Sequence, residues 1–291
     1  MKGLGRFFPP APAPGRTGDP GIFGPGSAAW RIGRERAIFA GGPAALLLQL
    51  AHPLVAEGVR AHSGFATDPL QRLRGTLDAV LTVSFGDQAQ VRSAAAHVAR
   101  KHRPVRGTLP EPSASLPAGT PYSADNPELA LWVFSTLVRT ALEVTDAFLR
   151  PVPAGERDAY YQDMKQMAHL FGVPDALLPE DYSALERYVE HQIGATLDVG
   201  STARMIARQI LTPDPPLLPP TLRPVPSVLA AGFLPPVLRE AYGLPWRRRE
   251  QASFAAIRRV TRLAAPLLPA RVRYWPHYAV ALDRVQATSA G

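Results

Sequence analysis

The feature that most constrains the fold of this chain is a series of helix-start signals, each followed by a stretch with helical periodicity. Asp68-Pro69 and Asn126-Pro127 each pair a side-chain N-cap with a proline at the first helical position, and Pro43 follows Gly41-Gly42 in the same role. Strand-like alternation bounded by turns is not evident in the sequence. We therefore expect an all-α protein.

The expected helices follow one another closely. They span about residues 27–39, 43–63, 69–85, 88–102, 127–150, 154–171, 181–193, 198–212, 226–232, 235–241, 248–264 and 275–287. With 46% hydrophobic residues among 291, the chain can bury a sizeable core. We expect a single large helical bundle domain over residues 27–291, with a buried cofactor pocket. Residues 1–26, broken throughout by Pro and Gly, form an extended arm in this interpretation.

The chain contains no cysteine. Disulfides, zinc–thiolate sites, iron–sulfur clusters, c-type haem attachment and thiolate-ligated haem are therefore excluded, and any metal must be held by histidine, carboxylate or another N/O ligand. The net charge of +8 is scattered, and no helix-turn-helix, zinc-finger or RNP pattern accompanies it. We expect no nucleic-acid partner.

The N-terminal segment lacks the uninterrupted apolar run of a secretory signal. The longest uncharged apolar stretch, residues 37–56, is broken by Gly41-Gly42-Pro43 and by His52-Pro53. We expect no transmembrane segment on that basis, while a peripheral membrane contact stays open. These features predict a cytoplasmic protein, and the richness in Ala, Arg and Pro fits a high-GC bacterial genome.

Two histidines lie on the expected helix 43–63. At about 100° per residue, His52 and His62 would share one apolar face of a straight helix, and at ~1.5 Å per residue they would lie about 15 Å apart, too far to bind one ion. Each is either a hydrogen-bonded core histidine or part of the wall of a pocket for a flat cofactor. For His52 the core interpretation is favoured, because Pro53 removes a backbone donor that a local polar side chain can replace. For His62 the two interpretations balance.

Polar side chains also mark one face of the expected helix 69–85. Arg72 and Thr76, four residues apart, share an otherwise apolar stripe. A guanidinium there either reaches solvent along its aliphatic stem or pairs with a carboxylate, such as a haem propionate, or with a polar reaction intermediate. The periodicity fits both alternatives.

A third histidine, His102, ends the expected helix 88–102 just before Pro104. An imidazole in a last turn can enter a cavity, with its second nitrogen held by a free helix carbonyl, as metal-bound histidines require. The alternative is a charged histidine that interacts with the helix dipole. His97, five residues earlier, would point about 140° away.

Four segments together resemble the all-helical oxygenase family that includes the latex-clearing proteins, which are rubber oxygenases, and the MpaB-type enzymes. They are LLLQLAHPLVAEGVRAHSGFATDPLQRLRGT, HRPVRG, PYSADNPELALWVFSTLV and YYQDMKQMAHLFGVP, in the family's order and approximate spacing. The similarity extends over about residues 28–285.

This resemblance implies haem b (iron protoporphyrin IX), held noncovalently in a helical core with His102 as the proximal iron ligand. It also implies that Arg72 and Thr76 face the haem pocket, and that the helix with His52 and His62 forms one wall of it. The implied function is a haem-dependent oxygenase that uses O₂ on a hydrophobic, isoprenoid or alkene-containing small molecule, with an electron donor if one is needed.

In that chemistry, Arg72 and Thr76 would stabilise developing negative charge, and His62 or Glu57 would transfer a proton. Two positions depart from the family pattern. Latex-clearing proteins can carry a lysine, a second axial ligand, directly before the pocket threonine, where this chain has Gly75. Many relatives carry histidine where this chain has Phe134, so a polar role is lost there.

Two other functions stay open. One is a non-catalytic haem-binding sensor or carrier, which would not consume O₂ with an alkene. The other is a basic helical protein without haem that binds nucleic acid or a membrane. Ser/His/Asp hydrolysis and phosphate-loop chemistry are disfavoured, because the sequence lacks G-x-S-x-G and G-x-x-x-x-G-K-[ST] motifs.

Overall fold

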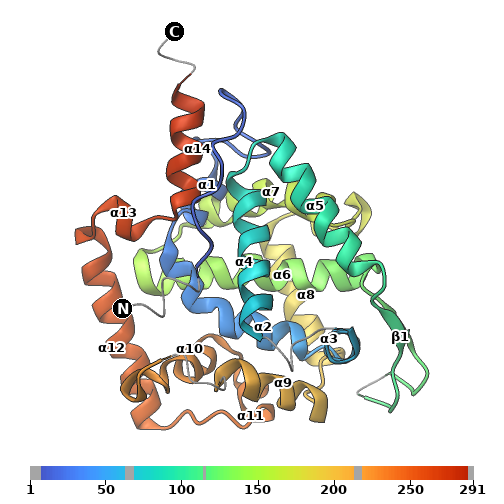
Figure 1. The fold of residues 1–291 in the computed structure, drawn as a ribbon. Helices are drawn as coiled ribbons and strands as arrows, with labels where there is room; N and C mark the ends of the chain where they lie inside the picture. The colour runs from blue at the N-terminus through green and yellow to red at the C-terminus, as the bar shows by residue number, and fades with distance from the viewer. Residues whose placement is uncertain (1–7, 63–68, 114–115, 213–217, 288–291) are drawn as a thin grey trace.

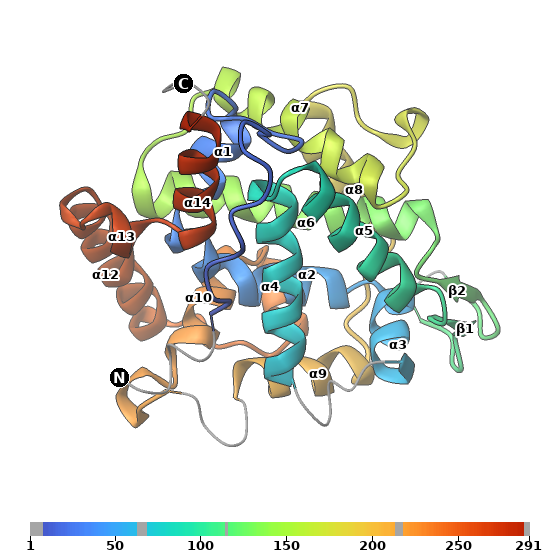
Figure 2. The ribbon, with the colours of Figure 1, turned by 45° about the horizontal axis from the view of Figure 1, so that its top comes forward.

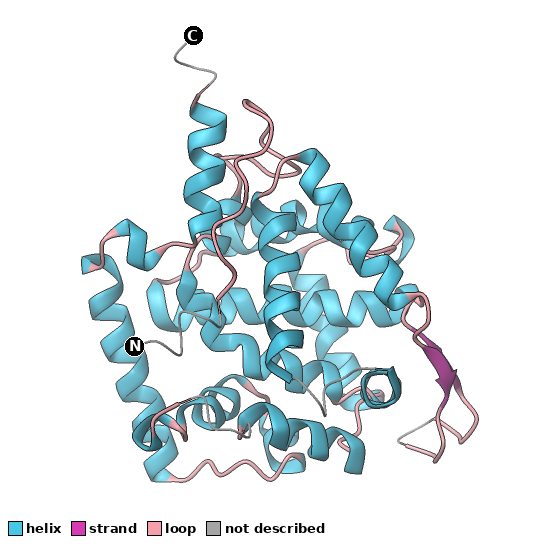
Figure 3. Cartoon of the chain, viewed as in Figure 1, coloured by secondary structure: helices cyan, strands magenta, loops and turns pink. Residues whose placement is uncertain are grey.

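The computed structural model describes residues 8–62, 69–113, 116–212 and 218–287, and only the backbone of residues 69–73. Within these ranges the chain is helical apart from loops and a small hairpin, which confirms the expected fold class (Figure 1). Figure 3 shows how the helices cross one another at several angles, with loops on the outside.

The α-helices follow one another along the described chain, with the longest connections after α5 and α9. In chain order they are α1 (Ala28–Gly33), α2 (Gly42–Leu50), α3 (Pro53–His62), α4 (Pro69–Phe85), α5 (Gln88–His102), α6 (Pro127–Val144), α7 (Ala154–Leu170), α8 (Tyr182–Ala195), α9 (Ser201–Leu211), α10 (Val225–Phe233), α11 (Pro236–Ala241), α12 (Arg248–Ala264), α13 (Ala270–Arg273) and α14 (Pro276–Gln286). Short 3-10 or π segments are η2 (Arg36–Gly41), η4 (Thr145–Leu149), η5 (Asp175–Leu177), η6 (Pro220–Leu222) and η7 (Ala265–Leu267).

The helix expected over residues 43–63 is in fact two helices, so that prediction was wrong. α2 ends at Leu50 and α3 begins at Pro53, and the helical segments on the two sides are bent by 102°. Pro53 explains the break, because it has no N–H for the helix ladder and its fixed φ suits the first position of a new helix. His52 and His62 therefore do not share one face: His52 is buried and His62 is exposed.

The turn-rich loop after α5 contains a β-hairpin that the sequence pattern did not indicate. β1 (Arg106–Thr108) pairs antiparallel with β2 (Pro121–Ser123), and Gly107 lies opposite Tyr122. A Cβ at Gly107 would lie 2.6 Å from the Tyr122 hydroxyl, so glycine lets the ring lie across the strand. The Tyr122 ring also reaches Gly58, and so the hairpin packs on α3.

The helix α6 joins two hydrophobic cores. One core gathers α1, α4, α7 and α8 around Val138. The other gathers α2, α9 and α10 around Trp132, on another side of α6. Both residues are almost fully buried, and α6 lies behind α4 in Figures 1 and 2.

A capping box fixes the connection between α4 and α5. The Asp87 carboxylate accepts a hydrogen bond from the Gln90 N–H at 2.7 Å, and the Gln90 side-chain oxygen accepts one from the Asp87 N–H at 2.9 Å. The two helices meet at this connection and diverge from it, so that their other ends lie well apart in Figures 1 and 2.

Residues 8–26 run as turns and extended chain beside α14 and the α4–α5 connection. The Arg284 guanidinium donates to the Asp19 carbonyl at 2.7 Å and to the Phe85 carbonyl at 2.9 Å. The Arg16 N–H donates to the Asp87 carboxylate at 2.7 Å. The division into an arm over 1–26 and a domain over 27–291 stays a prediction.

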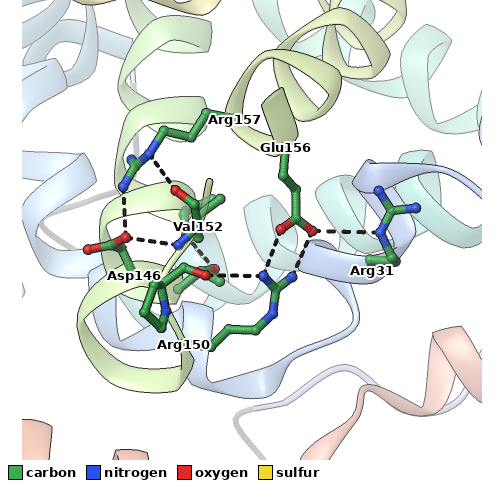
Figure 4. A network of polar contacts seen from close by, with 9 residues as sticks. Arg31, Asp146, Arg150, Val152, Glu156 and Arg157 are labelled. Carbon is green, nitrogen blue, oxygen red and sulfur yellow. Dashed lines mark hydrogen bonds and ion pairs between the residues drawn. The ribbon is translucent and has the colours of Figure 1, made fainter. Parts of the chain in front are cut away.

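Ion pairs tie η4 and the residue after it, Arg150, to the start of α7 and to α1 (Figure 4). The Glu156 carboxylate accepts from two Arg150 nitrogens at 2.6 and 2.7 Å and lies 3.6 Å from the Arg31 Nε. Arg157 donates to Asp146 at 2.8 Å. The hydrogen bonds from Arg150 hold the pKa of the Glu156 carboxyl below its usual value.

No single helix in the described ranges has both the length and the apolar composition needed to cross a membrane. The segments Arg36–Leu50 and Pro53–His62 meet those two criteria only when taken together, across their 102° bend.

Candidate functional site

His102 lies on the side of α5 that faces the rest of the protein. Val91, Ala95, Val98 and His102 follow one another at intervals of four, three and four residues, which places them on one side of the helix. Val91 is buried, Ala95 and Val98 are half-buried, and His102 is exposed. The stripe thus becomes more exposed with distance from the α4–α5 connection.

A similar stripe runs along α4 in the opposite direction. Val83 is fully buried, Val80 is half-buried and Thr76 is exposed, at intervals of three and four residues. Arg72 comes one further turn along, on the backbone of α4, but its side chain lies outside the described residues. We call the two stripes, Thr76–Val80–Val83 on α4 and Val91–Ala95–Val98–His102 on α5, the α4–α5 fork.

Behind the fork, α6 and α2 carry further half-buried apolar side chains. On α6, Val133 and Leu137, four residues apart, lie on one helix face, in a helix whose other faces are buried in the two cores. On α2, Leu46 and Gln49 are half-buried as well, and the Gln49 amide donates to the Thr136 hydroxyl at 3.0 Å. In both views α4 crosses in front of these two helices.

The two positions that depart from the family pattern are accounted for by their surroundings. Gly75 is exposed, and a Cβ there would meet no atom of the described residues within 4 Å. Phe134 is buried in the core, where its ring lies 6.3 Å from that of Tyr161. An apolar side chain is what that enclosed position requires.

His52 supplies the local hydrogen bond that its position before Pro53 suggests. It is 7% exposed, and its Nδ1 accepts from the Leu54 N–H at 3.3 Å. Burial lowers the pKa of the His52 imidazole to about 4, so the ring is neutral at pH 7. The contact ties the start of α3 to the end of α2.

His62 contacts the strand that follows His102. Its Nε2 lies 3.0 Å from the Arg106 carbonyl oxygen, and its ring meets the Tyr122 ring edge-on at 6.2 Å. Glu57 on the same helix is buried, and it accepts from the Arg60 Nε at 2.8 Å. Sequence patterns carry no signal for the contact between His62 and Arg106, because the residues are 44 positions apart.

The structure also has two surface hollows away from the fork. One, of about 260 Å³, lies between α9, α10 and α11 and includes Arg204, Arg208 and Tyr242. The other, of about 140 Å³, includes Glu57 and Asp198. Among the described residues no group of three or more His, Asp or Glu side chains is placed to hold a metal ion.

One comparison with known proteins identifies a family, and a second identifies two relatives. A family model described as "ER-bound oxygenase mpaB/B'/Rubber oxygenase, catalytic domain" matches residues 30–263. An uncharacterised protein of Mycobacterium bovis (Mb2261) and one of Mycobacterium tuberculosis (Rv2237) are each 32% identical to this chain over 240 residues, covering 79% of this chain and 89% of theirs. No solved structure matches.

Proposed function

The chain belongs to the mpaB and rubber oxygenase catalytic-domain family, and from this premise we propose that it is a haem b-dependent oxygenase with His102 as the iron ligand. The family supports an oxygenase, and therefore an enzyme that uses O₂. The haem, its ligand and the substrate class are our proposal.

The observation that carries this proposal is the position of His102 at the open end of the α4–α5 fork. Two apolar stripes become more exposed there step by step, and each ends on a polar side chain, His102 on one helix and Thr76 on the other. A half-buried apolar face between helices suits a flat, largely apolar group, and an imidazole in the last turn of a helix suits its metal.

The residues present fit a haem by three criteria. The chain has no cysteine, so a thiolate ligand is excluded, and His102 offers an imidazole nitrogen to the iron. Val80, Val98 and Val133 offer aliphatic surface on three different helices. Gly75 carries no side chain, and no described atom lies within 4 Å of its Cβ position, so this position adds no bulk beside Thr76.

When bound, the haem supplies iron that activates O₂. The chain's own residues would bind and orient this group. His102 would hold the iron through one ring nitrogen, and the aliphatic stripes of the fork would hold the porphyrin and exclude water from its face. The Thr76 hydroxyl and the Arg72 guanidinium, one turn apart on α4, stabilise negative charge or pair with a propionate.

For His62 two roles are proposed. Its contact with the Arg106 carbonyl supports positioning, because it fixes the strand four residues after His102. Proton transfer requires its second ring nitrogen to reach the substrate side. Glu57 is held by Arg60, which supports a structural role for that carboxylate. His52 accepts its hydrogen bond from the Leu54 N–H, two residues along the chain. Its proposed effect on the haem is therefore indirect, through the placement of α2.

The proposed substrate is a hydrophobic small molecule with a carbon–carbon double bond, and an electron donor takes part if the reaction needs one. The test combines two measurements on the purified chain. Titration with haem should produce a Soret band that saturates at one haem per chain, and the loaded protein should consume O₂ when a prenyl compound is added. Saturable haem binding without O₂ uptake on any alkene would favour a haem sensor or carrier, and absence of haem binding would contradict the proposal.

A further inference from the structure

The exposed hydrophobic side chains of this protein concentrate at one corner. Of the eight large hydrophobic residues that are exposed in the described chain, five lie between Val260 and Val272. Val260 and Leu263 are each 65% exposed, and Leu267 is 83% exposed. Soluble surfaces scatter such residues singly, so a group of this kind indicates a contact. The corner lies at the end of α12, in η7 and in α13, along the left edge of Figure 1.

The helix α12 packs one face against the protein and leaves a second apolar face exposed. Phe254 and Ile257 are half-buried against the second core. On another side of the helix, Ala256, Val260 and Leu263 are exposed at intervals of four and three residues, and Leu267 continues this direction into η7. Packing of the fold therefore does not account for the second apolar stripe.

The charges that this segment itself carries are nearly all positive. Residues 246–275 contain eight arginines and one carboxylate, and one of the arginines, Arg273, is paired with Glu35 of another segment. That carboxylate, Glu250, is half-buried and accepts from the Arg247 N–H at 2.9 Å at the start of α12. Arg258, Arg259 and Arg262 are exposed beside the stripe.

From this combination we propose that the corner formed by the end of α12, η7 and α13 binds the surface of an anionic membrane. Aliphatic side chains insert at the boundary between headgroups and acyl chains, while guanidinium groups beside them bind lipid phosphates and carboxylates. Nucleic acid would attract the arginines through its phosphates, but it has no apolar region into which Val260, Leu263 and Leu267 could insert. The proposal does not depend on haem or on oxygenase activity.

Vesicle co-sedimentation of the full chain tests the proposal. Vesicles of phosphatidylcholine with added phosphatidylserine should bind the protein, and vesicles of phosphatidylcholine alone should bind it at least about tenfold more weakly, since each arginine near an anionic surface contributes about fivefold. Binding should weaken as salt is raised. Equal binding to the two kinds of vesicle, or binding to neither, would overturn the proposal.

Two double variants assign the binding to this corner. Leu263→Ser with Leu267→Ser, and separately Arg259→Gln with Arg262→Gln, should each reduce binding about tenfold or more. The matched control is Val237→Ser, because Val237 is 55% exposed but lies on α11. All these side chains are exposed, so the variants should keep the wild-type unfolding temperature.

Wild-type vesicle binding by either double variant would contradict the assignment. Light scattering tests the alternative that a second copy of the chain, and not a membrane, covers the corner. A dimer that forms with rising protein concentration, and is lost in the leucine variant, would mean that a second copy of the chain covers the corner.

Discussion

Val91 and His102 lie on the same side of α5, three helical turns apart, and the helix face between them passes from buried to exposed. Val91 is 1% exposed and lies in the first turn of α5, next to the α4–α5 connection, whereas His102 lies at the open end of the fork. The chain thus presents an imidazole at the end of an apolar stripe that the described residues cover only in part.

Filling the fork with a large side chain should block haem binding. Ala95 lies on the inward stripe of α5, so Ala95→Trp should weaken haem binding by about tenfold or more, because the indole occupies space that the porphyrin needs. The matched control is Ala96→Trp, which is exposed on another side of the same helix and should bind haem as the wild type does. Haem titration followed by absorption measures both, and equal affinities for the two variants would place the haem elsewhere.

His52 should make the protein less stable in mild acid. The unfolded chain takes up a proton at this residue near pH 6.5, whereas burial lowers the pKa of the folded imidazole to about 4. Between these values the unfolded state binds more protons, so the free energy of unfolding falls as pH falls, by up to about 3 kcal/mol from this residue.

The variant His52→Asn removes this titration while keeping an acceptor for the Leu54 N–H. Urea unfolding at pH 7 and pH 4.5 should show a smaller loss of stability in this variant than in the wild type. His191→Asn, at an exposed position on α8, serves as the matched histidine control. An identical pH dependence in wild type and His52→Asn would refute the assignment.

Breaking the ion pair between Glu35 and Arg273 should destabilise the fold. Arg273 donates to the two oxygens of Glu35 at 2.8 and 2.7 Å, and Glu35 is only 4% exposed. Arg273→Ala leaves a buried carboxylate without its cation and should lower the free energy of unfolding by about 3 kcal/mol. Arg271→Ala, at an exposed position on the same short helix, should change it by less than about 0.5 kcal/mol. Chemical denaturation measures the free energy of unfolding of both variants. Equal losses in Arg273→Ala and Arg271→Ala would show that the ion pair between Glu35 and Arg273 contributes nothing specific to stability.

A methyl group at Gly232 should disturb the packing of α12. A Cβ there would overlap the Phe254 ring, which itself lies against Phe148 and Phe233. Gly232→Ala should cost about 1–3 kcal/mol of stability, and combining it with Phe254→Leu should cost less than the sum of the two single changes. Gly155→Ala, where a Cβ meets nothing within 4 Å, should be neutral or stabilising. Additive effects of Gly232→Ala and Phe254→Leu would rule out the overlap.

The helix pattern was predictable where a cap and a proline mark a boundary. α6 begins at Pro127 after Asn126, whose side chain accepts from the Glu128 N–H in the first turn, as the sequence signal suggests. The break at Pro53 was visible in the sequence, but the continuous apolar run around it favoured one helix; the extent of the bend depends on packing against α9 and the hairpin.

The candidate site was predictable only in its polar members. His102 and Thr76 stand out as polar residues on apolar faces, and helical spacing identifies their stripes. The half-buried face of α6, with Val133 and Leu137, has the same sequence pattern as a fully buried core face. How much of that face is exposed depends on where α4 crosses it, which the sequence of α6 does not specify. The contact of His62 with Arg106 depends on where α3 lies after the bend, which local periodicity does not specify.

The most direct measurement is the absorption spectrum of the chain produced with a supply of haem, compared with those of His102→Ala and His97→Ala. His97 is exposed on another side of the same helix, so its variant controls for loss of an imidazole from α5. We predict a Soret band in the wild type and in His97→Ala, and a lost or strongly shifted band in His102→Ala. A Soret band in His102→Ala identical to that of the wild type would contradict the role of His102 as the iron ligand.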